Sequence, residues 1–320
     1  MSILRSYFSK NDTIISNLYT NTARNPVAEL NFGASDLIVP NFGFTRFLFD
    51  LDLTYLEEQI ASGVISTGCT TGMTHILNMV NTSSFEDDLI NTNMTNGRKR
   101  ATSFDLILFR IPKYSGDTGE PQEWDEGVGF DYNDYALTKN GVSGQLSVIQ
   151  QNNNAAFSTR PTNWYQRSTI NNWSVPGLYD NRNTLTSLTG CNYSALTIVD
   201  VQHFELGNED ASFDMTNEIN SILNGTLTGV TGWGIAYVPD IENITGLTES
   251  YSVAFFSKYT QTFYQPYLQT TYDDLIKDDR NLFLQNQTNK LYLYVYQNGD
   301  FVNLDNLPTV SIEDSAGDLV

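Results

Sequence analysis

The sequence has few of the residues that most enzymes and nucleic-acid-binding proteins depend on. Its 320 residues include two cysteines, two histidines, and 17 Lys and Arg against 37 Asp and Glu, a formal net charge of −20. Because proteins hold DNA and RNA mainly through Lys and Arg at the phosphates, this acidity argues against specific nucleic-acid binding. The lack of cysteine excludes a disulfide scaffold, so Cys69 and Cys191 are expected to be buried free thiols. No paired ligand spacing suggests a zinc site, with or without His75 and His203.

Long apolar runs are also missing. The start, "MSILRSYFSKND", lacks the apolar core of about 7–15 residues that a signal peptide needs. No stretch reaches the roughly 18 consecutive apolar residues of a membrane-spanning helix. The sequence therefore predicts neither export by a signal peptide nor a membrane partner.

Catalytic signatures are absent as well: there is no G-x-G-x-x-G, Walker A loop, H-E-x-x-H or G-x-S-x-G. His75 and His203 lie in the strand-like stretches "THILNM" and "VQHFEL", which favours hydrogen-bonded sheet histidines over members of a catalytic set. A glycosidase needs two carboxylates at a set separation, and it is the least favoured interpretation. We expect no enzymatic activity and no cofactor.

What is abundant is β-forming sequence: Thr, Tyr, Phe, Val and Ile, interrupted by Asn, Gly, Asp and Ser. Strands do not alternate with long helices, so a parallel α/β sheet is disfavoured and an all-β fold is expected. The predicted strands cover residues 13–16, 29–33, 45–52, 73–80, 103–111, 194–201, 233–238, 251–257, 266–272 and 289–299.

Two short helices are predicted. The first, "LTYLEEQIASG" at 53–63, has Leu and Ile at helical spacing, with Asp52 or Thr54 as the cap. The second, "DMTNEINSILNG" at 214–225, has a similar apolar face, Asp214 as its cap and Asn-Gly at its end. Both are short, so packing on the β core must stabilise them.

The region 113–190 is long, polar and loop-like, with three tryptophans, and it allows two interpretations. Trp124, Trp164 and Trp173 suit either an exposed platform for sugars or the filling of the core and a subunit interface, and we favour the second. An acidic cluster in the same region suggests a solvated loop or, less favoured, a calcium site, since the ordered calcium-loop spacing is missing. Its members are Asp117, Glu120, Glu123, Asp125, Glu126, Asp131 and Asp134. We therefore expect no bound metal.

The stretch "YTQTFYQPYLQTTYDD" at 259–274 is rich in tyrosine. Its second half alternates like a strand that starts at Pro266, a position where the missing N–H does least harm. The preceding "KYTQTFYQ" is predicted as the turn that brings this strand beside 251–257. On this turn we expect Tyr259, Phe263 and Tyr264 to bury against a neighbouring subunit.

The last 45 residues differ from the rest. After a charged joint, "KLYLYVYQNG" alternates, with Leu291, Leu293 and Val295 on one face and three tyrosines on the other. The tyrosines Tyr292, Tyr294 and Tyr296 are further interface candidates. One such strand is too little for a core of its own. We therefore divide the chain into a domain at 1–275 and an extension at 276–320 that docks on its own domain or on another subunit.

The order of elements resembles a family of domains. "DTIIS", "AELNFGASD", "TRFLFDLDL", "WDEGVGFDY", "FDMTNEINSILNG" and "GWGIAYV" follow one another as in jelly-roll domains of the DNRLRE type, collinear over about 1–275. The resemblance implies a jelly-roll β-sandwich with two short helices and a C-terminal β extension. The motifs are moderately specific, and they indicate mainly the fold.

A second, narrower resemblance covers "YSVAFFSKYTQTFYQPYLQTTYDDLIKDDRNLFLQNQTNKLYLYV" and "VNLDNLPTV". These stretches are similar to virion proteins of tailed bacteriophages, particularly the neck and tail of crAss-like short-tailed phages. The resemblance implies a non-enzymatic ring protein between portal and tail, assembled with copies of itself and with other neck, portal or tail proteins. Its place would be the virion, assembled in the host cytoplasm.

The alternative is a carbohydrate-binding jelly roll, an adhesin or a head or tail decoration. Its site would use the aromatic loops and the acidic cluster. The missing signal peptide argues against an adhesin. We favour the virion structural protein.

Overall fold

The computed structural model describes residues 2–7, 10–16, 25–33, 44–62, 65, 72–82, 98–113, 124, 126, 162–165, 167, 173, 175–179, 197–242, 244, 247, 249–272 and parts of 284–313. The chain divides into two compact units, Met1–Asp273 and Asp274–Val320, close to the boundary at 275 that the sequence suggests. Whether the second unit docks on its own domain or on a partner stays a prediction. Cys69 and Cys191 lie outside the described residues.

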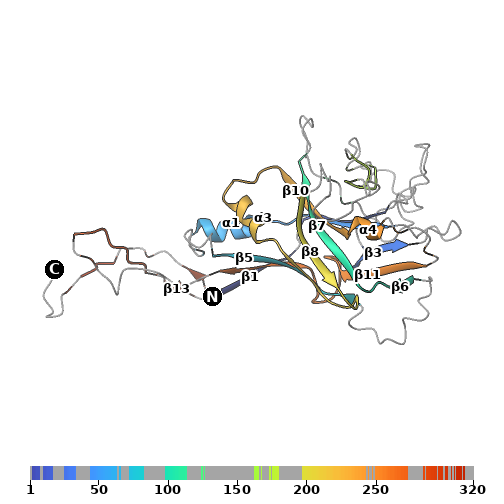
Figure 1. Ribbon diagram of the computed structural model, residues 1–320. Coiled ribbons are helices and arrows are strands. Elements are labelled where there is room, and N and C mark those ends of the chain that lie inside the picture. Colours follow the sequence, from blue (N-terminus) through green and yellow to red (C-terminus); the bar gives the residue numbers. More distant parts are fainter. Residues whose placement is uncertain are drawn as a thin grey trace, which may run out of the picture. The chain divides into compact units, whose positions relative to one another are not determined.

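The first unit contains two main sheets (Figure 1). Sheet A has the order β1 (Ser2–Tyr7), β12 (Tyr267–Tyr272), β5 (Thr74–Met79), β9 (Ala211–Asp214). Sheet B has the order β2 (Asp12–Ser16), β4 (Thr45–Phe49), β10 (Val230–Tyr237), β7 (Phe104–Pro112), β8 (Thr197–Phe204). Both are antiparallel throughout.

The strand pairs are nested along the sequence, so that each pair encloses the next one. β1 pairs with β12, β4 with β10, β5 with β9, and β7 with β8. The pairs β12–β5 and β10–β7 then join these hairpin pairs into sheets A and B. Nested pairing divided between two sheets is the jelly-roll topology. The all-β jelly-roll sandwich expected from the sequence is confirmed.

A third sheet, sheet C, extends the layer of sheet A. β11 (Ser250–Phe256) pairs antiparallel with β3 (Val27–Gly33) and parallel with β6 (Arg98–Arg100). The N–H of Phe256 donates to the carbonyl of Val80 at 3.0 Å, and Phe255 bridges to Asn81, just after β5 ends. These contacts link β11 to the end of β5, and so they connect sheet C to sheet A.

The central strands of sheet B, β4, β10 and β7, are buried on both faces, which explains apolar runs such as "FLF" in β4 and "LILF" in β7. On β4, Phe47 and Phe49 point into the main core between the sheets, whereas Leu48 points into a second core on the outer face. β7 alternates in the same way: Leu106 and Leu108 belong to the main core, with Ile107 and Phe109 in the second. Because successive strand side chains point to opposite faces, a strand buried on both sides must be apolar throughout.

Both predicted helices form, and the described residues contain a third, short one. α1 (Thr54–Ala61) buries Leu56, and the Asp52 Oδ1 accepts the N–H of Thr54 at 3.0 Å. α3 (Thr216–Leu223) buries Ile219, and the Asp214 Oδ1 accepts the N–H of Thr216 at 2.8 Å. α4 (Pro239–Glu242), which the sequence analysis missed, follows β10 at once. Leu56 and Ile219 pack in the main core, as the expectation of stabilisation by packing requires.

The predicted hairpin between 251–257 and 266–272 is wrong. β12 pairs with β1 and β5, whereas β11 pairs with β3 and β6. Neighbours in the sequence favour a hairpin, but nested winding places β11 and β12 in different sheets. The connecting segment, which we call turn 257–266, therefore crosses from sheet C to sheet A.

The second unit has little regular structure in its described residues. β13 (Tyr296–Gln297) pairs with β14 (Asp300–Phe301) in a two-stranded sheet. Among the described residues of the predicted strand over 289–299, Tyr296–Gln297 form a strand and 289–293 do not.

Candidate functional site

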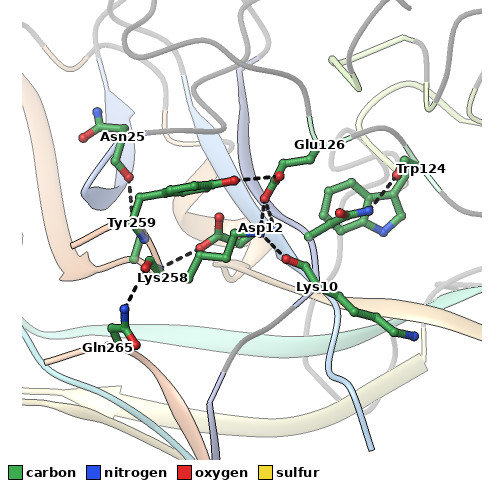
Figure 2. A network of polar contacts seen from close by, with 10 residues as sticks. Lys10, Asp12, Asn25, Trp124, Glu126, Lys258, Tyr259 and Gln265 are labelled. Carbon is green, nitrogen blue, oxygen red and sulfur yellow. Dashed lines mark hydrogen bonds and ion pairs between the residues drawn. The ribbon is translucent and has the colours of Figure 1, made fainter. Parts of the chain in front are cut away.

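Turn 257–266 carries three of the predicted interface residues; its start is bound to another segment, and its far end is bound back to its start. The N–H of Ser257 donates to the carbonyl of Pro26 at 3.0 Å, and its Oγ donates to the carbonyl of Asn25 at 2.6 Å. At the far end, the Gln265 Nε2 donates to the carbonyl of Lys258 at 3.1 Å (Figure 2). The turn is therefore held to the segment that leads into β3.

A buried carboxyl group lies under this turn. Asp12, the first residue of β2, is 1% exposed, and its Oδ2 accepts the N–H of Lys258 at 3.0 Å. Its other oxygen, Oδ1, has no hydrogen-bond partner, and the narrow recess beside Val27 and Ser257 has no space for a water molecule. Burial in this recess, opposed by the Lys258 N–H and charge and reinforced by the neighbouring Glu126, raises the pKa of Asp12 to about 7.

Glu126 and Lys258 complete the group that we call the Asp12 cluster, together with Asp12 and Tyr259. The Lys258 ammonium forms an ion pair with the Glu126 Oε1 and donates to the carbonyl of Lys10. Glu126 also accepts the N–H of Asp12 at 2.8 Å and the hydroxyl of Tyr259 at 2.8 Å, as Figure 2 shows. The Lys258 Nζ lies 4.8 Å from the centre of the Tyr259 ring.

The Asp12 cluster joins three segments that are far apart in the sequence. Asp12 and Glu126 are 114 residues apart, and Asp12 and Lys258 are 246 apart. The side chains of Lys258 and Glu126 are only 12% and 16% exposed, so their ion pair is weakly screened by water. The arrangement cross-links β2, the segment at Glu126 and turn 257–266.

The three turn residues have different environments. Tyr259 is half-buried and bound within its own domain through Glu126. Tyr264 is 36% exposed, and its ring stacks on Phe256 with the centroids 5.4 Å apart. Phe263 is 100% exposed. Of the three, Phe263 is therefore the residue that the fold leaves fully available to a partner.

The three tyrosines predicted in the extension are only partly described. Tyr292 is 44% exposed. Tyr296 lies in β13, opposite Phe301. Tyr294, and the side chain of Tyr296, lie outside the described part of the chain.

The three tryptophans are buried, so they do not form an exposed sugar platform. Trp124, Trp164 and Trp173 are 2%, 7% and 4% exposed, and all three belong to the second core on the outer face of sheet B. Two of the indole N–H groups form hydrogen bonds within the domain. Trp124 donates to the Thr231 carbonyl at 3.2 Å, and Trp173 donates to the Asn163 carbonyl at 2.8 Å. The interpretation as core residues is the one that their burial supports.

A fully buried arginine anchors the segment 175–179, which packs in the second core on the outer face of sheet B. The Arg46 guanidinium, on the outer face of β4, binds both carboxylate oxygens of Glu242, at 3.0 Å and 2.6 Å, and neither side chain is exposed. It also donates to the carbonyl groups of Gly177 and Tyr179. We call Arg46, Glu242 and Tyr179 the Arg46 cluster.

Aromatic rings surround the same guanidinium. Its central carbon lies 3.4 Å from the centre of the Tyr179 ring and 4.6 Å from that of Trp164. Gly177 packs so closely on Trp164 that an added Cβ would lie 2.3 Å from the ring, and its φ is +70°. Only glycine fits there, so the backbone of 175–179 lies directly against the tryptophan.

Both histidines lie on strands, as predicted. His75, in β5, is buried between the Thr270 hydroxyl at 2.8 Å and the Asn220 amide oxygen at 3.3 Å. Burial is the main reason that the pKa of His75 is lowered. His203, in β8, is exposed between Asp105 and Glu205, whose hydrogen bonds raise the pKa of His203. Both histidines are hydrogen-bonded sheet residues.

The acidic cluster proposed as a calcium alternative lies mostly outside the described residues. Asp117, Glu120, Glu123, Asp125, Asp131 and Asp134 are in that part. Glu126 is described and is bound to Lys258, Asp12 and Tyr259. Among the described residues, no group of three or more His, Cys, Asp and Glu side chains is placed to hold a metal ion.

Sequence reasoning missed both buried clusters. Arg46 and Glu242 are 196 residues apart, so no local spacing links them. The available signal was a charged residue inside an apolar strand: Arg46 in "TRFLFD", and Asp12 at the start of "DTIIS". Charged side chains are rarely fully buried without a partner, so each of these positions implied one.

Comparison with known proteins adds no relative: no family model matches this chain, and no curated protein matches it. Within the described residues, none of the helices is long and apolar enough to cross a membrane.

Proposed function

We propose that this chain is a non-enzymatic structural subunit of a bacteriophage particle, one copy in a ring of the neck or tail that connects portal to tail. Its partners are copies of itself and other neck, portal or tail proteins, and its location is the virion. The proposal starts from the sequence resemblance to virion proteins of short-tailed phages. The structure contributes a physical argument for a contact surface.

The observation that carries the proposal is Phe263 at the tip of an anchored turn. A large apolar side chain that is 100% exposed gains nothing for its own domain. The turn around it is fixed by Ser257, Lys258 and Gln265, so little conformational freedom is lost when a partner covers the ring. Exposed aromatic residues on rigid supports are typical anchors of protein interfaces.

The acidity of the chain fits a position around a DNA path. A net charge of −20 on each subunit would surround the lumen of a ring with negative potential. Such a lumen repels the phosphates, so DNA slides through it without binding.

The test uses Phe263→Ser, because Tyr259 is bound to Glu126 and its substitution would also disturb the domain. We expect this variant to lose most of its assembly, seen by light scattering and negative-stain microscopy, with an unchanged melting temperature. Leu206→Ser is the matched control, since Leu206 is also an exposed apolar residue, at 60%. Intact assembly of Phe263→Ser would contradict the proposal.

The same protein can be applied to a glycan array. The buried state of Trp124, Trp164 and Trp173 leads us to expect no binding. A monomer that binds one class of sugar would overturn the structural role in favour of the carbohydrate-binding module.

A further inference from the structure

Turn 257–266 forms one wall of the recess in which Asp12 is buried. The residues that line this recess are Asp12, Thr13, Ile14, Asn25, Val27, Ala28, Phe47 and Ser257. β2 pairs with β4, and β3 pairs with β11, so the walls that these strands form are fixed by backbone pairing. Ser257 is the lining residue that the turn supplies. The recess can therefore open at the turn while the strands around it stay paired.

Hydrogen bonds from two adjacent residues close the start of the turn over this recess. Ser257 donates its N–H to the Pro26 carbonyl at 3.0 Å and its hydroxyl to the Asn25 carbonyl at 2.6 Å. The N–H of Lys258 donates to the Asp12 Oδ2 at 3.0 Å (Figure 2). Asp12 thus lines the recess and is also one of the anchors of the turn.

An ionised Asp12 does not suit the closed recess. Its Oδ1 accepts no hydrogen bond, and the recess has no space for a water molecule that could donate one. A buried carboxylate needs donors for its charge, whereas the neutral acid is much less costly to bury. The closed turn therefore favours the protonated form of Asp12.

The charged groups of the Asp12 cluster do not compensate a second negative charge. Among the described residues, Lys258 and Glu126 are the charged groups that act on the Asp12 carboxyl, and they already form an ion pair with each other. The Tyr259 hydroxyl donates to Glu126 and adds no positive charge. A proton on Asp12 leaves one ammonium opposite one carboxylate, and the loss of this proton leaves one ammonium opposite two.

The described elements packed around the cluster supply no further counter-charge to Asp12. β3 and β4 line the recess with apolar side chains, those of Val27, Ala28 and Phe47. Before β2, the Lys10 ammonium forms an ion pair with Asp50 at 3.4 Å. A carboxylate at Asp12 is therefore stabilised best by water, and water reaches it when the start of the turn lifts.

We propose that turn 257–266 is a proton-controlled support for Phe263: protonation of Asp12 holds the turn closed, and ionisation shifts it towards an open form. The inference rests on the proposed function, in which Phe263 is the contact between subunits, and it supplies a regulation of that contact. A closed turn holds Phe263 ready for a partner, whereas an open turn must be ordered on binding, which costs free energy. Assembly through Phe263 therefore weakens as the pH rises.

The direction of the effect follows from the two states of Asp12. Burial in the closed recess, opposed by Lys258, raises the pKa of Asp12 to about 7, and the ordinary value of 3.8 returns when water reaches the carboxyl. Opening releases a proton at any pH between these values, so the open fraction rises with pH across this range. Above about pH 7 Asp12 is ionised in the closed turn as well, and the open fraction becomes constant.

Hydrogen exchange on the full-length protein, diluted until it is monomeric, measures opening without assembly. After correction for the intrinsic exchange rate, the opening constant of the amides at 258–265 should rise about tenfold for each pH unit between about pH 5 and about pH 6.5, and level off above about pH 7. Asp12→Asn has no proton to release, so its opening constant should not change with pH. Asp240→Asn removes the same charge at an exposed site on α4 and should keep the wild-type profile.

Assembly is then compared by multi-angle light scattering at about pH 5.5 and about pH 8, on either side of the Asp12 pKa of about 7. The rest of the chain, with His75 and His203, titrates in the same way in the wild type and in Asp12→Asn, so its effect cancels in the comparison. We expect the association constant of the wild type to fall at least about fivefold more than that of Asp12→Asn over this range. Phe263→Ser, which lacks the contact, should show no such difference.

The outcomes separate the inference from the proposed function. A wild-type exchange profile that is flat, or that Asp12→Asn shares, would overturn proton control of the turn whatever the assembly does. A proton-controlled turn with equal losses of assembly in the wild type and in Asp12→Asn would overturn control of the contact, and the ring function would stand. A wild type that is monomeric at every pH would overturn the proposed function, and the exchange profile would still decide whether Asp12 controls the turn.

Discussion

The Arg46 cluster and the Asp12 cluster both bury charge beside sheet B, but they balance it differently. In the first, a guanidinium meets both oxygens of one carboxylate, and neither side chain is exposed. In the second, two carboxyl groups share the neighbourhood of one ammonium, and the Asp12 Oδ1 has no partner. In the complete pair every charge has a partner, whereas the incomplete one makes the anchor of turn 257–266 depend on the protonation of Asp12.

The largest expected effect is on the complete pair. Arg46→Met leaves the Glu242 carboxylate buried without its counter-charge, which should lower the free energy of unfolding by about 3–5 kcal/mol. Urea denaturation measures the loss. The double variant Arg46→Met/Glu242→Leu should lose less than Arg46→Met alone, because no charge is then left buried.

Lys258→Met makes the same change in the Asp12 cluster. Glu126 keeps the Asp12 N–H and the Tyr259 hydroxyl, so we expect a smaller loss, about 1.5–3 kcal/mol. An equal or larger loss than for Arg46→Met would contradict the distinction between the clusters.

The next expected effect is a dependence of the free energy of unfolding on pH, caused by the titration of Asp12. Its pKa is about 7 in the folded protein and 3.8 in the reference state, so the folded state binds more protons between these values. Stability is therefore fully present below pH 3.8 and is lost as the pH rises through 7, by up to about 4 kcal/mol. Asp12→Asn removes this loss, and the unfolding free energies of variant and wild type should diverge between pH 4 and pH 8.

His75 serves as the internal control for that series. Burial lowers the pKa of His75, so its contribution is present above the unfolded value of 6.5 and is lost as the pH falls. This slope is opposite in sign and common to both proteins, so it cancels in their difference. If the two stability curves run parallel, Asp12 does not titrate as described.

The smallest effects come from a matched pair of tyrosines. Tyr259→Phe removes a 2.8 Å hydrogen bond to Glu126, and Tyr179→Phe removes a 3.3 Å hydrogen bond to Glu242. We expect losses of about 1–1.5 kcal/mol and about 0.5 kcal/mol, because Glu242 keeps both guanidinium contacts. Tyr55→Phe, at an exposed site on α1, should cost nothing measurable in the same thermal melts. The reverse order of the two losses would show that Glu126 does not depend on Tyr259.

Much of the fold followed from local sequence pattern. The strands β4, β5, β7 and β11 and the helices α1 and α3 were predicted near their observed bounds, because alternation and capping act over a few residues. Four of the described strands, β1, β6, β9 and the two-residue β14, were missed. β1 and β6 have little apolar alternation, and of β9 only the last residue, Asp214, carried a prediction, as the cap of the following helix.

The candidate site was less accessible. Phe263 was singled out correctly as a turn residue, and its full exposure is a tertiary fact that the sequence does not contain. Tyr259 looked like its equivalent, yet Glu126, 133 residues earlier in the chain, binds its hydroxyl. The strand predicted at 289–299 is the opposite case: its pattern is strong, but a strand forms only where a sheet edge is supplied.

The nested strand order also determines how the domain responds to a pulling force. β12 is the last strand of the domain, and it is paired on both sides, with β1 and with β5. Tension on the segment after Tyr272 therefore acts along β12 and loads both of its hydrogen-bond ladders in shear, so that many bonds must break together. A domain built in this way can bear load on its C-terminal segment without opening its core.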